Sequence, residues 1–99
     1  MGIEASDLIL SANRALWGIV TPNLRKASIR CEEKTIIVSF FYDKKITEDE
    51  KELASCAGAE VIADYPAEFF IEEELFQIAS PNPLPQKGYT VYHRYEQLD

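Results

Sequence analysis

The sequence predicts a single α+β domain over residues 1–99, with its elements in the order α-β-β-α-β-β. We expect a four-stranded, mainly antiparallel sheet with two helices on one face, because this arrangement buries both helices against the same sheet. Two segments carry apolar residues at helical spacing, and four others are apolar or alternating over the length of a strand. The hydrophobic fraction of 46% in 99 residues is enough for one core, which excludes disorder as the default.

The first helix is expected to begin near Ser6 and to end before Pro22. Ser6 is a suitable N-cap, and Asp7 in the first turn interacts favourably with the positive end of the helix dipole. Gly18 and Pro22 mark where the helix frays and stops. Trp17, close to that end, is expected to fold onto the core. The inward stripe consists of Leu8, Ala12, Ala15, Leu16 and Ile19.

Residues 26–42 predict an antiparallel hairpin. Apolar and polar residues alternate over residues 26–31, which is typical of a half-buried strand, and residues 32–34 form a polar turn. Residues 35–42 are apolar on both faces apart from Ser39. This second strand is therefore expected to be central in the sheet and covered at least partly on both sides.

The second helix is expected to open at a capping box formed by Thr47 and Glu50. In this motif the threonine hydroxyl accepts the backbone N–H of the third helical residue, and the glutamate side chain reaches back to the N-cap. Gly58 weakens the middle of the helix and makes a kink or an early stop conceivable there. The predicted inward stripe is Leu53, Cys56, Ala57 and Val61.

Two further strands, residues 69–78 and 89–96, are expected to form a second antiparallel hairpin around a proline-containing loop at residues 80–88. In the first of these strands, apolar residues stand at odd-numbered positions in the first half and at even-numbered positions in the second half, so they would point to opposite faces. A β-bulge near residues 72–74 would return them to one face. The residues concerned are Phe69, Ile71, Phe76 and Ile78.

The charge of the chain restricts its partners. Seventeen acids against ten bases give a net charge of −7, which disfavours nucleic acid and anionic membranes as partners because both are bound largely through Lys and Arg. The first 45 residues carry a net charge of +2 and the remainder one of −9. The acidic stretch from Thr47 to Glu74 is therefore a candidate surface for a basic protein, which it would attract electrostatically.

Seven acids of this stretch are the candidate partner-binding residues. The alternative for the helix acids is that they only cap and solubilise the helix. Three consecutive glutamates on a strand repel one another and need a further reason. The seven are Glu48, Asp49, Glu52, Asp64, Glu72, Glu73 and Glu74.

Catalytic, cofactor and metal sites are not expected. His93 lies on a strand with alternating aromatics and is expected to pack in the sheet, while Cys31 and Cys56 are too far apart for a CxxC site and are expected to be buried free thiols. The sequence contains no Walker loop, GxGxxG, HExxH or GxSxG motif. Without a basic leader or a long apolar run, a cytoplasmic location is expected.

Several segments are shared with a known group of proteins. They are ALWG at residues 15–18, VTPNLR at 20–25, FFYD at 40–43, EVIADYP at 60–66 and GYTVY at 88–92. Over nearly its whole length the chain resembles small bacterial immunity-type proteins of polymorphic toxin and contact-dependent growth inhibition loci. The resemblance implies a cytosolic α/β antitoxin that binds one cognate toxin and has no activity of its own. Lys44 stands where a turn glycine is expected.

The favoured interpretation is a non-enzymatic cytosolic immunity protein that neutralises a cognate toxin by occluding a basic active site. Its carboxylates would mimic phosphate, and aromatic anchors would supply desolvated contacts. The alternative is a structural or oligomeric α+β module, such as a homodimer built by pairing through the last strand. A third alternative is an enzyme that uses carboxylates and His93.

Overall fold

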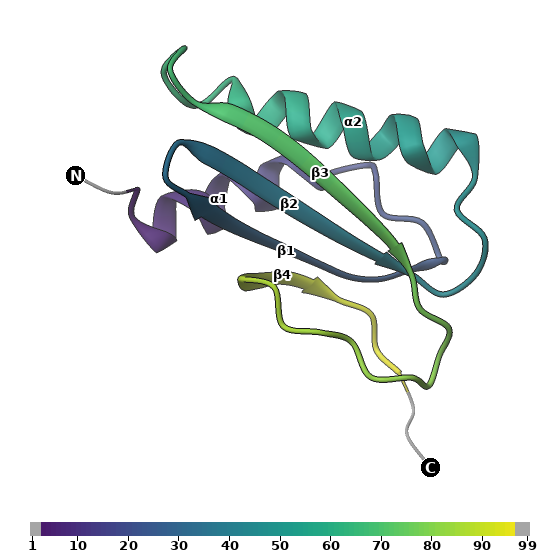
Figure 1. The fold of residues 1–99 in the computed structure, drawn as a ribbon. Coiled ribbons are helices and arrows are strands. Elements are labelled where there is room, and N and C mark those ends of the chain that lie inside the picture. The colour runs from purple at the N-terminus through teal and green to yellow at the C-terminus, as the bar shows by residue number, and fades with distance from the viewer. Residues whose placement is uncertain (1–2, 97–99) are drawn as a thin grey trace.

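The computed structural model describes residues 3–96, which contain two helices and a four-stranded sheet (Figure 1). In chain order the elements are α1 (Ala5–Ala15), β1 (Leu24–Glu32), β2 (Thr35–Tyr42), α2 (Glu48–Ile62), β3 (Phe70–Gln77) and β4 (Tyr89–His93). The strand order is β3-β2-β1-β4, in which β1 pairs antiparallel with β2 and β4, and β2 pairs parallel with β3. Both helices lie on one face, which confirms the predicted α+β class. Neither α1 nor α2 is long and apolar enough to cross a membrane.

β1 and β2 form the predicted hairpin, and β2 has the predicted bounds. Glu33 takes a positive φ of 57° in the turn between them. Phe40 and Phe41 are neighbours on β2 and so point to opposite faces of the sheet, yet both are fully buried. This confirms β2 as a central strand that is covered on both sides.

α2 begins at the predicted capping box. The Thr47 hydroxyl oxygen accepts a hydrogen bond from the Glu50 backbone N–H at 3.1 Å, and the Glu50 carboxylate accepts one from the Thr47 backbone N–H at 3.0 Å. Two N–H groups at the helix start are thereby satisfied. The cap fixes where the helix starts, and with it which residues face the sheet.

The inward face of α2 differs in part from the predicted one. Glu50 is buried, and Ala54, four residues later, lies on the same side of the helix and also faces the core. Of the residues predicted to face inward, Leu53 is half-buried and Cys56 is exposed. The helix continues through Gly58 without interruption. The buried residues of α2 are Glu50, Ala54, Ala57, Gly58 and Val61.

α1 ends earlier than its apolar pattern suggests. Its N-cap is Glu4, whose side chain makes no capping hydrogen bond, so the expected cap at Ser6 is wrong. The chain leaves the helix after Ala15 and turns through Gly18, which has a φ of +78°. Trp17 lies in this turn and is 85% exposed, so its predicted contact with the core is wrong. The stripe is confirmed as buried at Leu8, Ala12, Ala15 and Leu16.

β3 and β4 do not form the expected second hairpin. They lie at opposite edges of the sheet, β3 beside β2 and β4 beside β1. The expected bulge in β3 is also wrong, because its register with β2 is unbroken from Phe70 to Gln77. Phe76 instead packs on the face opposite the helices, where its ring stacks on Phe41 with centroids 5.3 Å apart. Apolar residues on both faces of β3 therefore pack against other parts of the protein, and no bulge is needed.

The connection between β3 and β4 covers this second face. It crosses from one edge of the sheet to the other, and its carbonyl oxygens accept hydrogen bonds from the Ser28 hydroxyl at 3.1 Å and the Lys26 ammonium at 3.2 Å. The Lys87 ammonium lies over the Phe76 ring, 5.2 Å from its centroid. Helices cover one face of the sheet and this connection covers the other, which is why most residues of β1 and β2 are buried, including the polar Arg25, Lys26 and Ser28.

Candidate functional site

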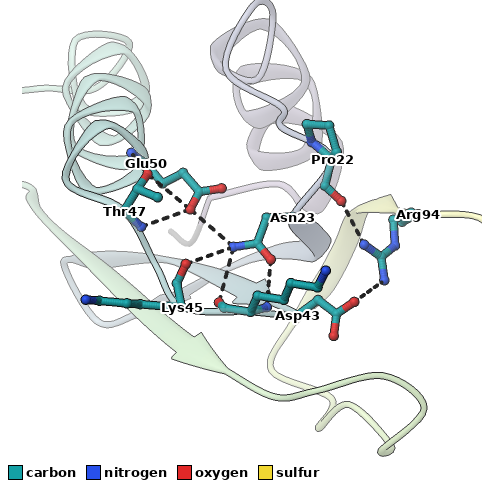
Figure 2. Close-up of a pocket in the computed structure, with 8 residues that line it drawn as sticks. Pro22, Asn23, Asp43, Lys45, Thr47, Glu50 and Arg94 are labelled. Atoms are coloured by element: carbon teal, nitrogen blue, oxygen red, sulfur yellow. Dashed lines mark hydrogen bonds and ion pairs between the residues drawn. The ribbon is translucent and has the colours of Figure 1, made fainter.

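Three chain segments meet at one end of the sheet around a shallow pocket of about 330 Å³ (Figure 2). They are the connection from α1 to β1, the connection from β2 to α2, and the residues after β4. The Asn23 side-chain amide donates to the Lys44 carbonyl oxygen and to Glu50 Oε1, each at 3.2 Å. The Thr21 hydroxyl donates to Glu50 Oε2 at 2.5 Å. These bonds fix the start of α2 against the segment that follows α1.

Glu50 is the carboxylate at the centre of these contacts. Burial raises its pKa, but hydrogen bonds from Thr21, from the Thr47 backbone and from Asn23 outweigh burial and lower the pKa below its usual range. Glu50 therefore stays ionised at neutral pH. Its role is to accept hydrogen bonds in the scaffold.

A chain of ion pairs borders the other side of the pocket. The Arg94 guanidinium donates to Asp43 Oδ2 at 3.1 Å and to Glu96 Oε2 at 3.0 Å. Glu96 also accepts two hydrogen bonds from Arg25, at 2.7 and 2.8 Å. These bonds, foremost those from Arg25, lower the pKa of Glu96 to about 2. Asp43, Glu50 and Arg94 are therefore held by hydrogen bonds within the scaffold, whereas the lining residues Lys44 and Lys45 are exposed.

Three of the seven predicted acids project from the outer side of this scaffold. Glu48, Asp49 and Glu52 lie in the first two turns of α2 and are exposed. Glu48 forms an ion pair with Lys51 at 2.8 Å, in which both side chains are solvent-exposed. Such an exposed pair is weak and can open at little cost. All three carboxylates are therefore accessible to a partner.

The other four acids lie elsewhere. Asp64, beyond the far end of α2, accepts hydrogen bonds from Ser11 at 2.6 Å and Arg14 at 2.9 Å. The structure therefore does not gather the seven acids into one patch. On β3, Glu72 is exposed, Glu73 lies beneath α2 next to Gly58, and Glu74 accepts hydrogen bonds from Ser39 and Arg30 on the opposite face.

Trp17 is a candidate contact residue that sequence reasoning does not identify. Its side chain is 85% exposed, and Val20 in the same connection is exposed as well. Trp17 lies three residues after Arg14, which bonds to Asp64 beyond the far end of α2, and four residues before Thr21, which bonds to Glu50 at the start of α2. Tryptophan is among the residues most enriched at the energetic centre of interfaces. The one feature of the sequence that points to this role is that Trp17 is next to Leu16 in the chain but is not itself part of the predicted apolar stripe.

The residues considered for catalysis do not assemble. His93 is exposed, with Nδ1 2.8 Å from the Arg94 carbonyl oxygen, so its expected packing within the sheet is wrong. Cys31 is half-buried, and burial raises its pKa. Cys56 is exposed, so its expected burial is wrong; it lies outside the buried side of α2, which runs through Glu50, Ala54 and Ala57. Within residues 3–96, no group of three His, Cys, Asp or Glu residues is placed to hold a metal ion.

A protein-family model described as MafI2 immunity protein matches residues 5–96, which is nearly the whole chain. No curated protein matches the sequence. The matched range includes both helices, all four strands and the segments around the pocket.

Proposed function

This chain belongs to the MafI2 immunity protein family, and from that membership we propose that it neutralises one cognate bacterial toxin in the cytoplasm by binding to it, without catalysis. The family match carries this proposal. The geometry is consistent with it, because Glu50, Asp43 and Arg94 at the pocket are held in hydrogen bonds of the scaffold.

We infer that the contact with the toxin centres on the first two turns of α2. Glu48, Asp49 and Glu52 are accessible there, and the Thr47 cap with the Glu50 hydrogen bonds holds the helix start in place. Fixed carboxylates at this spacing are suited to occupy a basic active site where phosphates would bind. A preorganised surface also loses less conformational entropy on binding.

We propose Trp17, in the connection that follows α1, as a second and apolar part of the toxin contact. A charged surface accelerates encounter, whereas a desolvated aromatic anchor slows dissociation. Trp17 is exposed and adjoins the segment that is hydrogen-bonded to α2 through Thr21. The proposed contact therefore combines an acidic helix end with one large aromatic side chain.

The mass of the complex tests this function. The chain of 11.3 kDa should form a one-to-one complex with the toxin domain encoded by the neighbouring gene, measured by size-exclusion chromatography with light scattering. A toxin domain from an unrelated locus serves as the control and should elute separately. If the neighbouring gene product does not bind and the chain elutes as a dimer, the oligomeric-module alternative replaces the immunity function.

A further inference from the structure

β3 is an edge strand with an unpaired side. It has eight residues, its register with β2 is unbroken, and within residues 3–96 no strand pairs with its outer edge. The Phe70 N–H donates to the Lys34 carbonyl oxygen and the Ile78 N–H to the Tyr42 carbonyl oxygen, both at 2.8 Å. Because the direction of the backbone N–H and C=O groups alternates from residue to residue along a strand, those of the even-numbered residues point towards β2. The outward N–H and C=O groups belong to Ile71, Glu73, Leu75 and Gln77.

The other edge of the sheet is less suited to pairing. β4 has five residues, and its register with β1 shifts between Ala27 and Ser28. Short edge strands and irregularities are devices that discourage the addition of a further strand. β3 has neither feature and contains no proline. It is therefore the better template for an added strand.

The charge on β3 decides what can pair with it. Two copies of β3, side by side about their centres, would bring Glu72, Glu73 and Glu74 of one copy against the same residues of the other. Like charges opposite each other destabilise a strand pair, whereas opposite charges stabilise it. Glu74 is already paired with Arg30, so Glu72 and Glu73 carry the charge that opposes self-pairing and favours a strand with Lys or Arg.

The side chains along this edge fit the same partner. Glu72 is exposed on the face away from the helices, and Phe70 on that face is 66% exposed. Glu73 lies on the helix side, and no hydrogen bond to its carboxylate is found among the described residues. A basic strand would offer cations to these carboxylates and apolar atoms to the Phe70 ring.

We propose that the outer edge of β3 pairs with an extended, basic segment of the cognate toxin, which adds to the sheet as a fifth strand. This inference rests on the proposed immunity function and names a second contact, separate from the acidic end of α2. Main-chain hydrogen bonds supply affinity in this mode of recognition, and alternate side chains supply specificity.

Hydrogen exchange of the backbone amides tests the pairing directly. In the free chain, the outward amides of Ile71, Glu73 and Leu75 should exchange fast, whereas those of Glu72 and Glu74, bonded to β2, should exchange slowly. In complex with the toxin domain of the neighbouring gene, exchange of the outward amides should slow by at least about tenfold. The inward amides serve as the internal control.

A pair of variants at one position separates the backbone from the charge. Glu73→Pro removes an outward N–H and leaves the bonds to β2 in place, so it should weaken the complex by about tenfold relative to Glu73→Gln, which keeps the N–H. If light scattering shows the complex and the outward amides still exchange as in the free chain, the β3 pairing is wrong while the immunity function stands. If no complex forms, both proposals fail.

Discussion

Glu96→Gln should lower the free energy of unfolding by about 3 kcal/mol, a large share of the roughly 5–15 kcal/mol that stabilises a domain. Arg25 and Glu96 form a two-bond ion pair in which their side chains are only 3% and 10% exposed. Removal of one charge from such a pair leaves the other buried without a counterion. The shift of the urea unfolding midpoint measures this loss.

Glu32→Gln is the matched control. It removes the Glu32 carboxylate from its ion pair with Arg30, where the side chains are 64% and 23% exposed. Exposed pairs contribute little, so the expected change is within about 0.5 kcal/mol. Equal midpoint shifts for the two variants would show that burial of the Arg25–Glu96 pair does not determine its contribution.

The same ion pair makes the fold sensitive to acid. Arg25 lowers the pKa of Glu96 from an ordinary 4.5 to about 2, so the carboxylate stabilises the folded chain in its ionised form. This stabilisation is fully present above about pH 4.5 and is lost as the pH falls through about 2. The wild type should therefore lose stability more steeply than Glu96→Gln over this interval.

Neutralisation of the α2 acids should slow association with the toxin by about tenfold at low salt and leave dissociation nearly unchanged. The triple variant is Glu48→Gln, Asp49→Asn and Glu52→Gln, measured by stopped-flow kinetics. Exposed charges act by steering, and steering fades as the Debye length falls from about 10 Å at 0.1 M salt to about 3 Å at 1 M. The wild type should thus depend on salt more steeply than the variant.

A second triple variant controls for net charge. Glu4→Gln, Asp7→Asn and Glu33→Gln remove the same number of exposed acids, near α1's first turn and in the β1–β2 turn, away from the start of α2. Its association rate should stay close to that of the wild type. Equal slowing in both variants would assign steering to the net charge and remove α2 from the contact.

Features determined by local chemistry were predictable from the sequence. The capping box at Thr47 needs only two side chains at a fixed spacing, and β2 has an apolar run bounded by polar turns. The place of β3 beside β2 depends instead on the crossover through α2, and the long connection that follows crosses a face of the sheet to β4. A parity change at Phe76 therefore suggested a bulge, although the residue packs against Phe41 on that face.

The candidate site was predictable in part. Charge counting found Glu48, Asp49 and Glu52, but the sequence does not show that Glu74 is bonded to Ser39 on another face of the molecule. Trp17 was assigned to the core because a helix through residue 19 would keep it near the apolar stripe. The helix ends at Ala15, and the turn that follows leaves the indole exposed.

Survival of cells that express the toxin domain of the neighbouring gene tests the neutralising function most directly. Co-expression of this chain should restore growth, and full rescue should require about as many copies of the chain as of the toxin, counted by quantitative immunoblot. Such one-to-one rescue follows if each chain occupies one toxin. Absence of rescue at equal or higher levels of folded chain would contradict the immunity function, and rescue by far fewer chains than toxin molecules would contradict inhibition by binding.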